Sequence, residues 1–217
     1  FASCYGDHRD LLSYPTVRAS DLFVSGATFS SSGAGTCVVQ ADGAATTNFN
    51  AASQTQNVTI AKATPTINFS AAPTPTFPGG NFTVSASTDN TDSSTLTYSY
   101  VSGPCAFVSG ATFSSSGAGT CVVQASGAAT ANFNAASQTQ NVSIAKATAT
   151  VTLGSLAQTY DGTPKSATAT TTPNGLTVDF TYNGSPTAPT NAGSYTVVGT
   201  INDANYVGTS TDTLVIS

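Results

Sequence analysis

Short runs of alternating apolar and polar residues recur along most of the chain. The run 81–87 places three apolar side chains on one face, those of Phe82, Val84 and Ala86. The run 96–101 places three more on its inward face, those of Leu96, Tyr98 and Tyr100. A period of two residues is typical of a half-buried β-strand. We therefore expect strands over these two runs and, on similar patterns, over 66–69, 119–125 and 138–146.

The last third of the chain shows the same alternation between turn signals. Val178, Phe180 and Tyr182 alternate with polar residues, and the dipeptides Asn174-Gly175 and Asn183-Gly184 are typical of tight turns. Glu and Met are absent, and lysine is limited to Lys62, Lys146 and Lys165, so the usual helix-forming residues are scarce. The pattern predicts an all-β protein.

A long segment of the chain occurs twice. Residues Phe23–Thr64 recur as Phe107–Thr148, with differences only at the pairs Asp42/Ser126, Thr47/Ala131 and Thr59/Ser143. A repeat of one-domain length indicates an array of small modules that each bury their own core. We expect a first module over 1–62, a central module over 63–147 and a last module over 148–217.

The first module is incomplete or atypical. Its second half copies the central module, but the short segment 1–22 stands where the central copy has the longer segment 63–106, and it does not match the repeat. Three interpretations are open. The segment is a shortened terminal cap, or strands of another chain complete its sheet by β-strand addition, or it reflects how the chain was cut or its sequence assigned.

Two sets of motifs resemble known families. In the central module, TPTINFSAAPTPTFPGGNFTVSAS, LTYSYVSGPC and GAGTCVVQASG resemble the tandem bacterial Ig-like repeats of very large secreted and surface proteins. In the last module, TYDGTPK, NAGSYTV and NYVG resemble the MBG module of bacterial surface proteins, which is also an Ig-like β-sandwich. The resemblance implies tandem Ig-like β-sandwich modules arranged as beads on a string, at the cell surface or secreted.

The charge of the chain argues against nucleic acid as a partner. The chain has five basic and ten acidic residues, for a net charge of −5. A surface that binds DNA or RNA must instead carry enough positive charge to neutralise phosphates. No run reaches the roughly 20 apolar residues that cross a bilayer. We therefore expect neither a nucleic acid partner nor a membrane span.

Four cysteines occur, and they allow three pairings. Cys105 and Cys121 lie in one module, so this pair is favoured as a disulfide, which suits a small core in an oxidising compartment. Cys37 is the copy of Cys121, but Asp21 occupies the position that matches Cys105. Elimination leaves Cys4 as the partner of Cys37, and two free or intermolecular thiols are the alternative.

Chemistry beyond disulfides has little support. His8, the only histidine, lies in a polar cluster with Arg9 and Asp10, and no paired histidines or Cys-x-x-Cys spacing suggest zinc. The oxygen-rich loop 87–92, and in the last module Asp161 or Asp203 with Asn205, could offer ligands to calcium. They suit turns better, because the spacing of an EF-hand calcium loop is missing. We expect no catalytic, cofactor or metal site, and no enzyme.

The sequence predicts an extracellular structural protein of a bacterial cell surface. Its tandem modules would form a stalk, array or filament, with self-association between neighbouring subunits or modules and possible strand addition at the first module. The alternative is an adhesin-type module that recognises a glycan or a host protein through a loop face of the last module.

Overall fold

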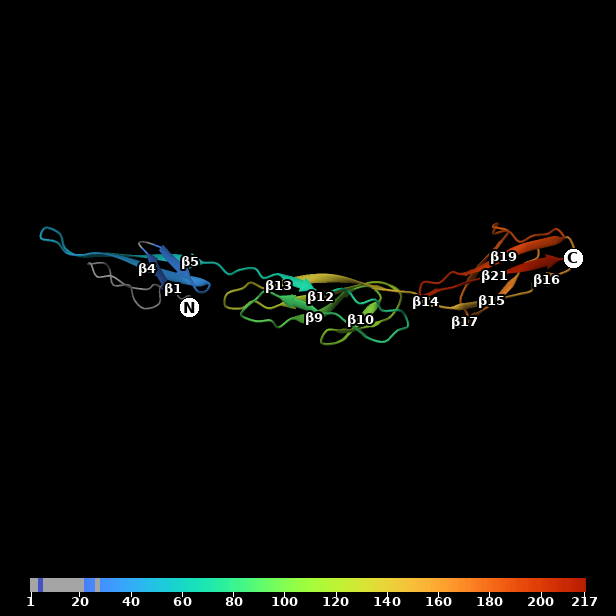
Figure 1. The fold of residues 1–217 in the computed structure, drawn as a ribbon, viewed down its shortest axis with the longest axis horizontal. Helices are drawn as coiled ribbons and strands as arrows, with labels where there is room; N and C mark the ends of the chain where they lie inside the picture. Colours follow the sequence, from blue (N-terminus) through green and yellow to red (C-terminus); the bar gives the residue numbers. More distant parts are fainter. Residues whose placement is uncertain (1–3, 6–21, 26–27) are drawn as a thin grey trace. The chain divides into compact units, whose positions relative to one another are not determined.

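A computed structural model describes residues 4–5, 22–25 and 28–217 (Figure 1). Every regular element in this described part is a β-strand, so the prediction of an all-β protein is confirmed. The described residues contain no helix that could serve as a membrane span.

The chain divides into two compact units. Unit 1 holds the described residues up to Phe69 together with Ala86–Thr97 and Ala125–Gln138, and unit 2 holds Ser70–Ser85, Tyr98–Gln124 and Thr139–Ser217. The division runs across strands of the central module, so neither unit coincides with one predicted module. The module boundaries and the beads-on-a-string arrangement stay predictions.

The first module contributes a small sheet and a hairpin. The sheet has the order β1 (Cys4–Tyr5), β3 (Thr28–Ser31), β2 (Leu22–Ser25). The hairpin joins β4 (Gly35–Gly43) to β5 (Ala52–Ile60), antiparallel and in continuous register. Val58 on β5 is 42% exposed, whereas Val142, its copy in the central module, is fully buried. The side chains that bury this position in the central module therefore have no equivalent among the described residues of the first module.

The central module has three small sheets. Their strand orders are β6 (Ile67–Phe69) with β8 (Ala86–Thr88); β10 (Cys105–Ser109), β11 (Thr112–Ser115), β7 (Phe82–Thr83); and β13 (Ala136–Ile144), β12 (Gly119–Gly127), β9 (Thr97–Ser102). The core contains Phe113, which is fully buried and stacks on Phe82 at 5.9 Å between ring centroids. The strand predicted over 119–125 is confirmed as part of β12, and the residues that its alternation places on one face, Cys121, Val123 and Ala125, are fully buried.

Two predictions for the central module are wrong. The run 81–87 is not one strand, because the chain changes partners within it: the Val84 amide donates to Ala111, and the next carbonyl, Ser85, accepts from Ser70. Tyr100 does not point inward. It is 44% exposed, and its hydroxyl donates to the Gly103 carbonyl at 3.1 Å, so the ring stays at the surface where the polar tip finds a partner.

The last module combines one larger sheet with two strand pairs. The sheet order is β16 (Ala157–Gln158), β21 (Thr209–Ile216), β19 (Gly193–Ile201), β18 (Val178–Tyr182), and the pairs are β15 (Thr150–Gly154) with β17 (Thr168–Thr172) and β14 (Ala147–Thr148) with β20 (Tyr206–Val207). The Asn183-Gly184 turn has φ values of 51° and 84°, as a two-residue hairpin turn requires. The prediction of a turn there is confirmed.

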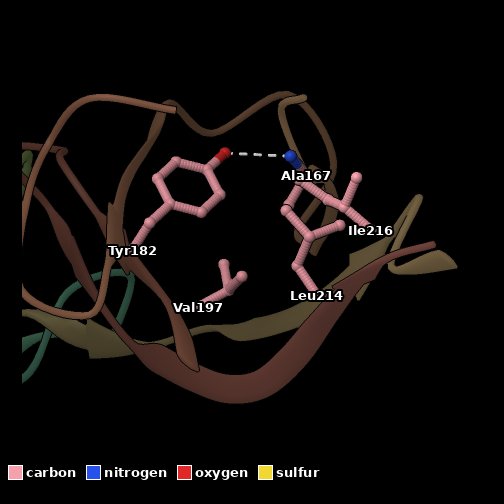
Figure 2. Close-up of a cluster of buried hydrophobic side chains, with 5 residues drawn as sticks. All are labelled: Ala167, Tyr182, Val197, Leu214 and Ile216. Atoms are coloured by element: carbon pink, nitrogen blue, oxygen red, sulfur yellow. Dashed lines mark hydrogen bonds between the residues drawn. The ribbon is translucent and has the colours of Figure 1, made fainter. Parts of the chain in front are cut away.

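The last module has a well-formed core (Figure 2). Val197, Leu214 and Ile216 are almost completely buried and pack with Ala167 and Tyr182. The Tyr182 hydroxyl accepts a hydrogen bond from the Ala167 amide at 2.9 Å. Because this ring carries its polar tip to a buried main-chain donor, it fills the core without leaving an amide unsatisfied.

Candidate functional site

The Lys-Ala-Thr segment that ends each copy of the repeat pairs with a loop of the next module. Ala63 forms a parallel bridge with Phe133, and its amide donates to the Asn132 carbonyl at 2.9 Å. Ala147 pairs in parallel with Tyr206, and its amide donates to the Asn205 carbonyl at the same 2.9 Å. The first set lies within unit 1 and the second within unit 2. Both connecting segments are therefore hydrogen-bonded to the following module, the first through an isolated bridge and the second through the short strand β14.

The lysine of each segment binds the same loop. Lys62 Nζ donates to the carbonyl of Thr130 at 2.5 Å, and Lys146 Nζ donates to the carbonyl of Asp203 at 2.6 Å. Each carbonyl belongs to the second residue before the loop asparagine. This hydrogen bond fixes the end of the lysine side chain to the loop, so the aliphatic part of the side chain spans the junction.

An asparagine completes each junction. The Asn132 side-chain oxygen accepts from the Ala34 amide at 2.8 Å, and the Asn205 oxygen accepts from the Ala118 amide, also at 2.8 Å. Ala34 and Ala118 are copies of one another in the repeat, and each is the central residue of a Gly-Ala-Gly turn. We name each of these asparagine-to-turn contacts an asparagine lock.

The glycine that precedes each alanine leaves room for the lock. A Cβ added to Gly33 would lie 2.8 Å from the Asn132 side-chain oxygen, and one added to Gly117 would lie 3.0 Å from the Asn205 oxygen. Carbon and oxygen atoms do not approach so closely without a shift of one partner. The turn is thus matched to an incoming asparagine.

Asp92 orients the asparagine of the first lock. One carboxylate oxygen accepts from the Asn132 amide nitrogen of the main chain at 2.8 Å, and the other accepts from the side-chain nitrogen at 3.0 Å. A carboxylate can only accept, so the side-chain NH₂ turns to it and the oxygen faces Ala34. The bond from the Asn132 side chain, followed by that from its main chain, lowers the pKa of Asp92.

A short capped turn presents each asparagine. In the central module the Phe133 amide donates to the Thr130 hydroxyl at 3.3 Å, and in the last module the Tyr206 amide donates to the Asp203 carboxylate at 3.1 Å. Short polar side chains favour such turns because they bind main-chain groups a little further along the chain. The second junction also has an aromatic contact, with Phe77 edge-on to Tyr206 at 5.9 Å.

The sequence patterns did not predict the two locks. They indicated module boundaries beside Lys62 and Lys146, but they pointed to no junction role for Asn132 or Asn205. One signal was present, because Thr-Ala-Asn-Phe in the central module and Asp-Ala-Asn-Tyr in the last module share a pattern. The partners of the two locks are separated by 98 and 87 positions in the sequence, so the pattern alone did not identify them.

The structure joins Cys105 to Cys121 in a disulfide, with 5.7 Å between their Cα atoms. Cys37 is also disulfide-bonded and is 4% exposed. The side chain of Cys4, its predicted partner, lies outside the described residues, so that pairing stays a prediction. His8, Arg9 and Asp10 lie outside them as well.

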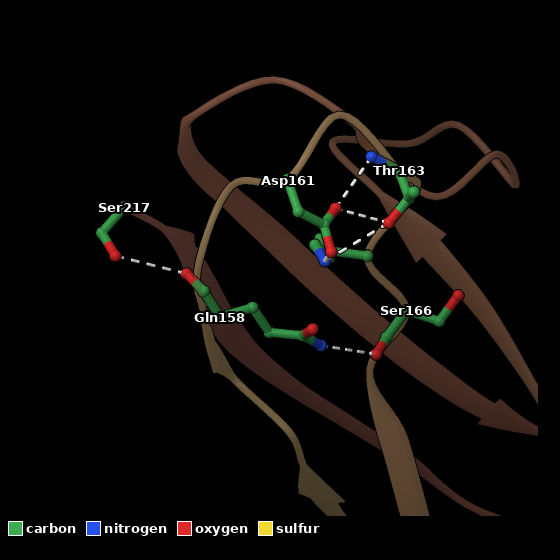
Figure 3. A network of polar contacts seen from close by, with 6 residues as sticks. Gln158, Asp161, Thr163, Ser166 and Ser217 are labelled. Atoms are coloured by element: carbon green, nitrogen blue, oxygen red, sulfur yellow. Dashed lines mark hydrogen bonds and ion pairs between the residues drawn. The ribbon is translucent and has the colours of Figure 1, made fainter.

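The acidic loops bind their own chain. An Asp161 carboxylate oxygen accepts from the Lys165 ammonium at 2.5 Å. The other carboxylate oxygen accepts from the Thr163 amide at 2.9 Å (Figure 3). The bond from Lys165, followed by those from Thr163, holds the pKa of Asp161 well below its usual value. Within the described residues, no group of three or more potential metal ligands comes together. These carboxylates order loops, which is the role that the turn interpretation gives them.

Comparison with known proteins supports the assignment of the last module. Residues 149–217 match the family model of the MBG domain, so this segment is an MBG-type module. The match indicates a surface or extracellular module. No curated protein matches the chain. The resemblance of the central module to tandem bacterial Ig-like repeats stays a prediction.

Proposed function

We propose that this chain, which ends in an MBG-type module, is an extracellular structural protein of a bacterial cell surface. Its tandem Ig-like modules form a stalk, array or filament and have no catalytic role. The observation that carries the proposal is the asparagine lock, which occurs twice. In both locks an alanine amide donates to an asparagine side-chain oxygen, at the same distance of 2.8 Å. A stiff spacer needs specific contacts between consecutive modules, and the two locks are contacts of this kind.

The connecting segments support this role by their composition and their bonds. A flexible linker is typically rich in Gly and Ser and has no partner. Here a lysine and main-chain hydrogen bonds bind each connection to the module that follows, and an asparagine of that module binds the Gly-Ala-Gly turn of the module before it. Each module junction would therefore resist bending more than a free linker of the same length.

Composition fits an extracellular location. The disulfide between Cys105 and Cys121 suits an oxidising compartment, where small cores are commonly stapled in this way. The MBG-type module belongs to a kind found at the cell surface, which agrees with a secreted chain. Sparse charge, with only 7% charged residues, suits a spacer better than a surface that steers an ionic ligand.

Limited proteolysis with trypsin tests the proposal, because both junction lysines are cleavage sites. In the native chain we expect slow cleavage after Lys62 and Lys146. Asn132→Ala should accelerate cleavage after Lys62 alone, and Asn205→Ala after Lys146 alone. Asn141→Ala, an exposed asparagine on β13, is the matched control. Cleavage at both sites that is as fast in the native chain as in the variants would show that the locks do not hold.

A second candidate function is recognition of a glycan or host protein by the last module. One observation favours it: the ring of Tyr160 is 52% exposed and lies next to the loop that Asp161 orders. Exposed aromatic rings on ordered loops suit sugar or protein contacts. A glycan array with the native chain and Tyr160→Ala tests this candidate, and equal silence of both on every glycan would count against it.

A further inference from the structure

A third copy of the locking loop has no partner among the described residues. It is the connection between β4 and β5, where Asn48 and Phe49 match Asn132 and Phe133 in the repeat. Its turn closes in the same way, since the amide of Thr46 donates to the Phe49 carbonyl at 2.9 Å, and the amide of Thr130 donates to that of Phe133 at 2.9 Å. The free loop and the occupied loop thus share this turn-closing hydrogen bond.

Exposure distinguishes the free copy from the occupied ones. Phe49 is 76% exposed, whereas Phe133 and Tyr206 are half-buried. Asn48 is exposed, whereas Asn132 and Asn205 are half-buried. The asparagine and the aromatic residue of this loop are thus less exposed in the two copies that contact another module than in the first copy.

The last module has a turn that resembles the Gly-Ala-Gly half of a lock. Its turn at Asn191-Ala192-Gly193 precedes the long strand β19, just as the Gly-Ala-Gly turns precede the strands β4 and β12, which are of the same length. The strand-opening glycine has a φ of +154° there, against +139° at Gly35 and +131° at Gly119. Ala192 is exposed, whereas its counterparts in the occupied turns are half-buried.

We propose that a second copy of this chain docks its Ala192 turn on the Asn48–Phe49 loop, with the Ala192 amide donating to the Asn48 side-chain oxygen. The inference rests on the proposed function of the asparagine lock within one chain. Because the two surfaces are different patches of the molecule, the contact is heterologous, and repetition gives an open head-to-tail filament unless the rotation closes a ring.

One residue makes this contact weaker than the locks within a chain. Asn191 stands where both occupied turns have glycine, and at those glycines a Cβ would come within 2.8 to 3.0 Å of the asparagine oxygen. The incoming Asn48 must therefore shift. Two separate chains also lack the high effective concentration that a covalent connection provides. Replacement of Asn191 by glycine should strengthen association.

Sedimentation velocity of the full chain over a range of concentrations tests the proposal. We expect concentration-dependent oligomers in the native chain, an association constant raised about tenfold in Asn191→Gly, and one lowered at least about tenfold in Asn48→Ala. The double variant should lose the gain of Asn191→Gly. Asn57→Ala, an exposed asparagine on the same hairpin, is the matched control and should associate as the native chain does. Thermal melts establish that every variant is folded.

Two outcomes would overturn the proposal. The first is a chain that stays monomeric at all concentrations, both in its native form and with Asn191→Gly. The second is association that survives Asn48→Ala but is lost in Val58→Asp. This result would assign the contact to the face of the β4–β5 hairpin on which Val58 is exposed. Neither outcome affects the locks within a chain, which the trypsin experiment tests separately at Lys62 and Lys146.

Discussion

Replacement of Asn132 by alanine should open the first module junction and leave the second closed. The change removes the oxygen that accepts from the Ala34 amide at 2.8 Å. It leaves the main-chain amide of residue 132 in place, with its bond to Asp92. The substitution therefore targets the lock rather than the turn that presents it.

The expected size of the effect follows from one neutral hydrogen bond. A typical bond of this kind contributes about 1 kcal/mol, and a donor left without a partner adds to the loss when it is partly buried. Ala34 is half-buried, so the cost should be about 1 to 1.5 kcal/mol. This corresponds to an opening equilibrium constant about five to ten times larger.

Amide hydrogen exchange of Ala34, measured by NMR, reads this opening directly. When reclosing is fast, the exchange rate scales with the equilibrium constant for local opening, so exchange at Ala34 should accelerate about five- to tenfold. Ala118 serves as the control in the same molecule, and its rate should not change. NMR is needed because residues 27–41 and 111–125 have identical sequences, which mass spectrometry of peptides would not separate.

The reciprocal variant tests whether each lock acts only at its own junction. Asn205→Ala should accelerate exchange at Ala118 and leave Ala34 unchanged. If either variant accelerated both amides equally, the effect would be a general loss of stability. If neither amide responded, the two locks would contribute nothing to the junctions in solution.

Three further outcomes are expected. Replacement of Cys105 and Cys121 by alanine should lower the free energy of unfolding by about 3 kcal/mol, as chemical denaturation would measure, because a loop with a sequence separation of 16 is no longer closed. The pKa of Asp92 is lowered in the folded chain, so the stability that its carboxylate contributes is present above the unfolded pKa of about 3.9 and is lost as pH falls through the folded pKa. The NMR signal of the Asn132 side-chain NH₂ should shift in that acid range in the native chain, and it should not shift there in Asp92→Asn. Tyr182→Phe should lower thermal stability by about 1 kcal/mol, since a buried amide loses its acceptor, and an unchanged melting temperature would contradict this.

Local patterns predicted most strands correctly because their information is local. The buried positions Cys121 and Val123 followed from alternation, and the Asn183-Gly184 turn followed from residues that tolerate a left-handed backbone. Tyr100 failed because alternation does not show that its hydroxyl has a carbonyl partner at Gly103. The prediction of one strand over 81–87 failed because the two halves of this run pair with different segments. Those partners, at Ala111 and Ser70, are distant in the sequence, so alternation within the run does not show them.

The candidate site was out of reach for a related reason. A lock joins a loop asparagine to a Gly-Ala-Gly turn that is distant in the sequence. Asparagine, glycine and alanine are all common in loops, so none of these residues indicates the contact by itself. The two copies of the repeat are what reveal it. Ala34 and Ala118 are equivalent in sequence and have equivalent partners in structure, so the contact is a property of the module rather than an accident of one loop.

The two hairpins β4–β5 and β12–β13 have almost the same sequence, which leaves side-chain chemistry unable to tell their strands apart during folding. Pairing of β4 with β13 would satisfy nearly the same contacts but would have to close the segment 44–135 instead of 44–51. Loop-closure entropy disfavours the exchange by about 2 kcal/mol, or roughly thirtyfold. Two chains at high concentration lose that protection, because strands can then be exchanged between molecules. Correct pairing in this protein is thus decided by chain connectivity, and crowding of nascent copies is the condition under which it should fail.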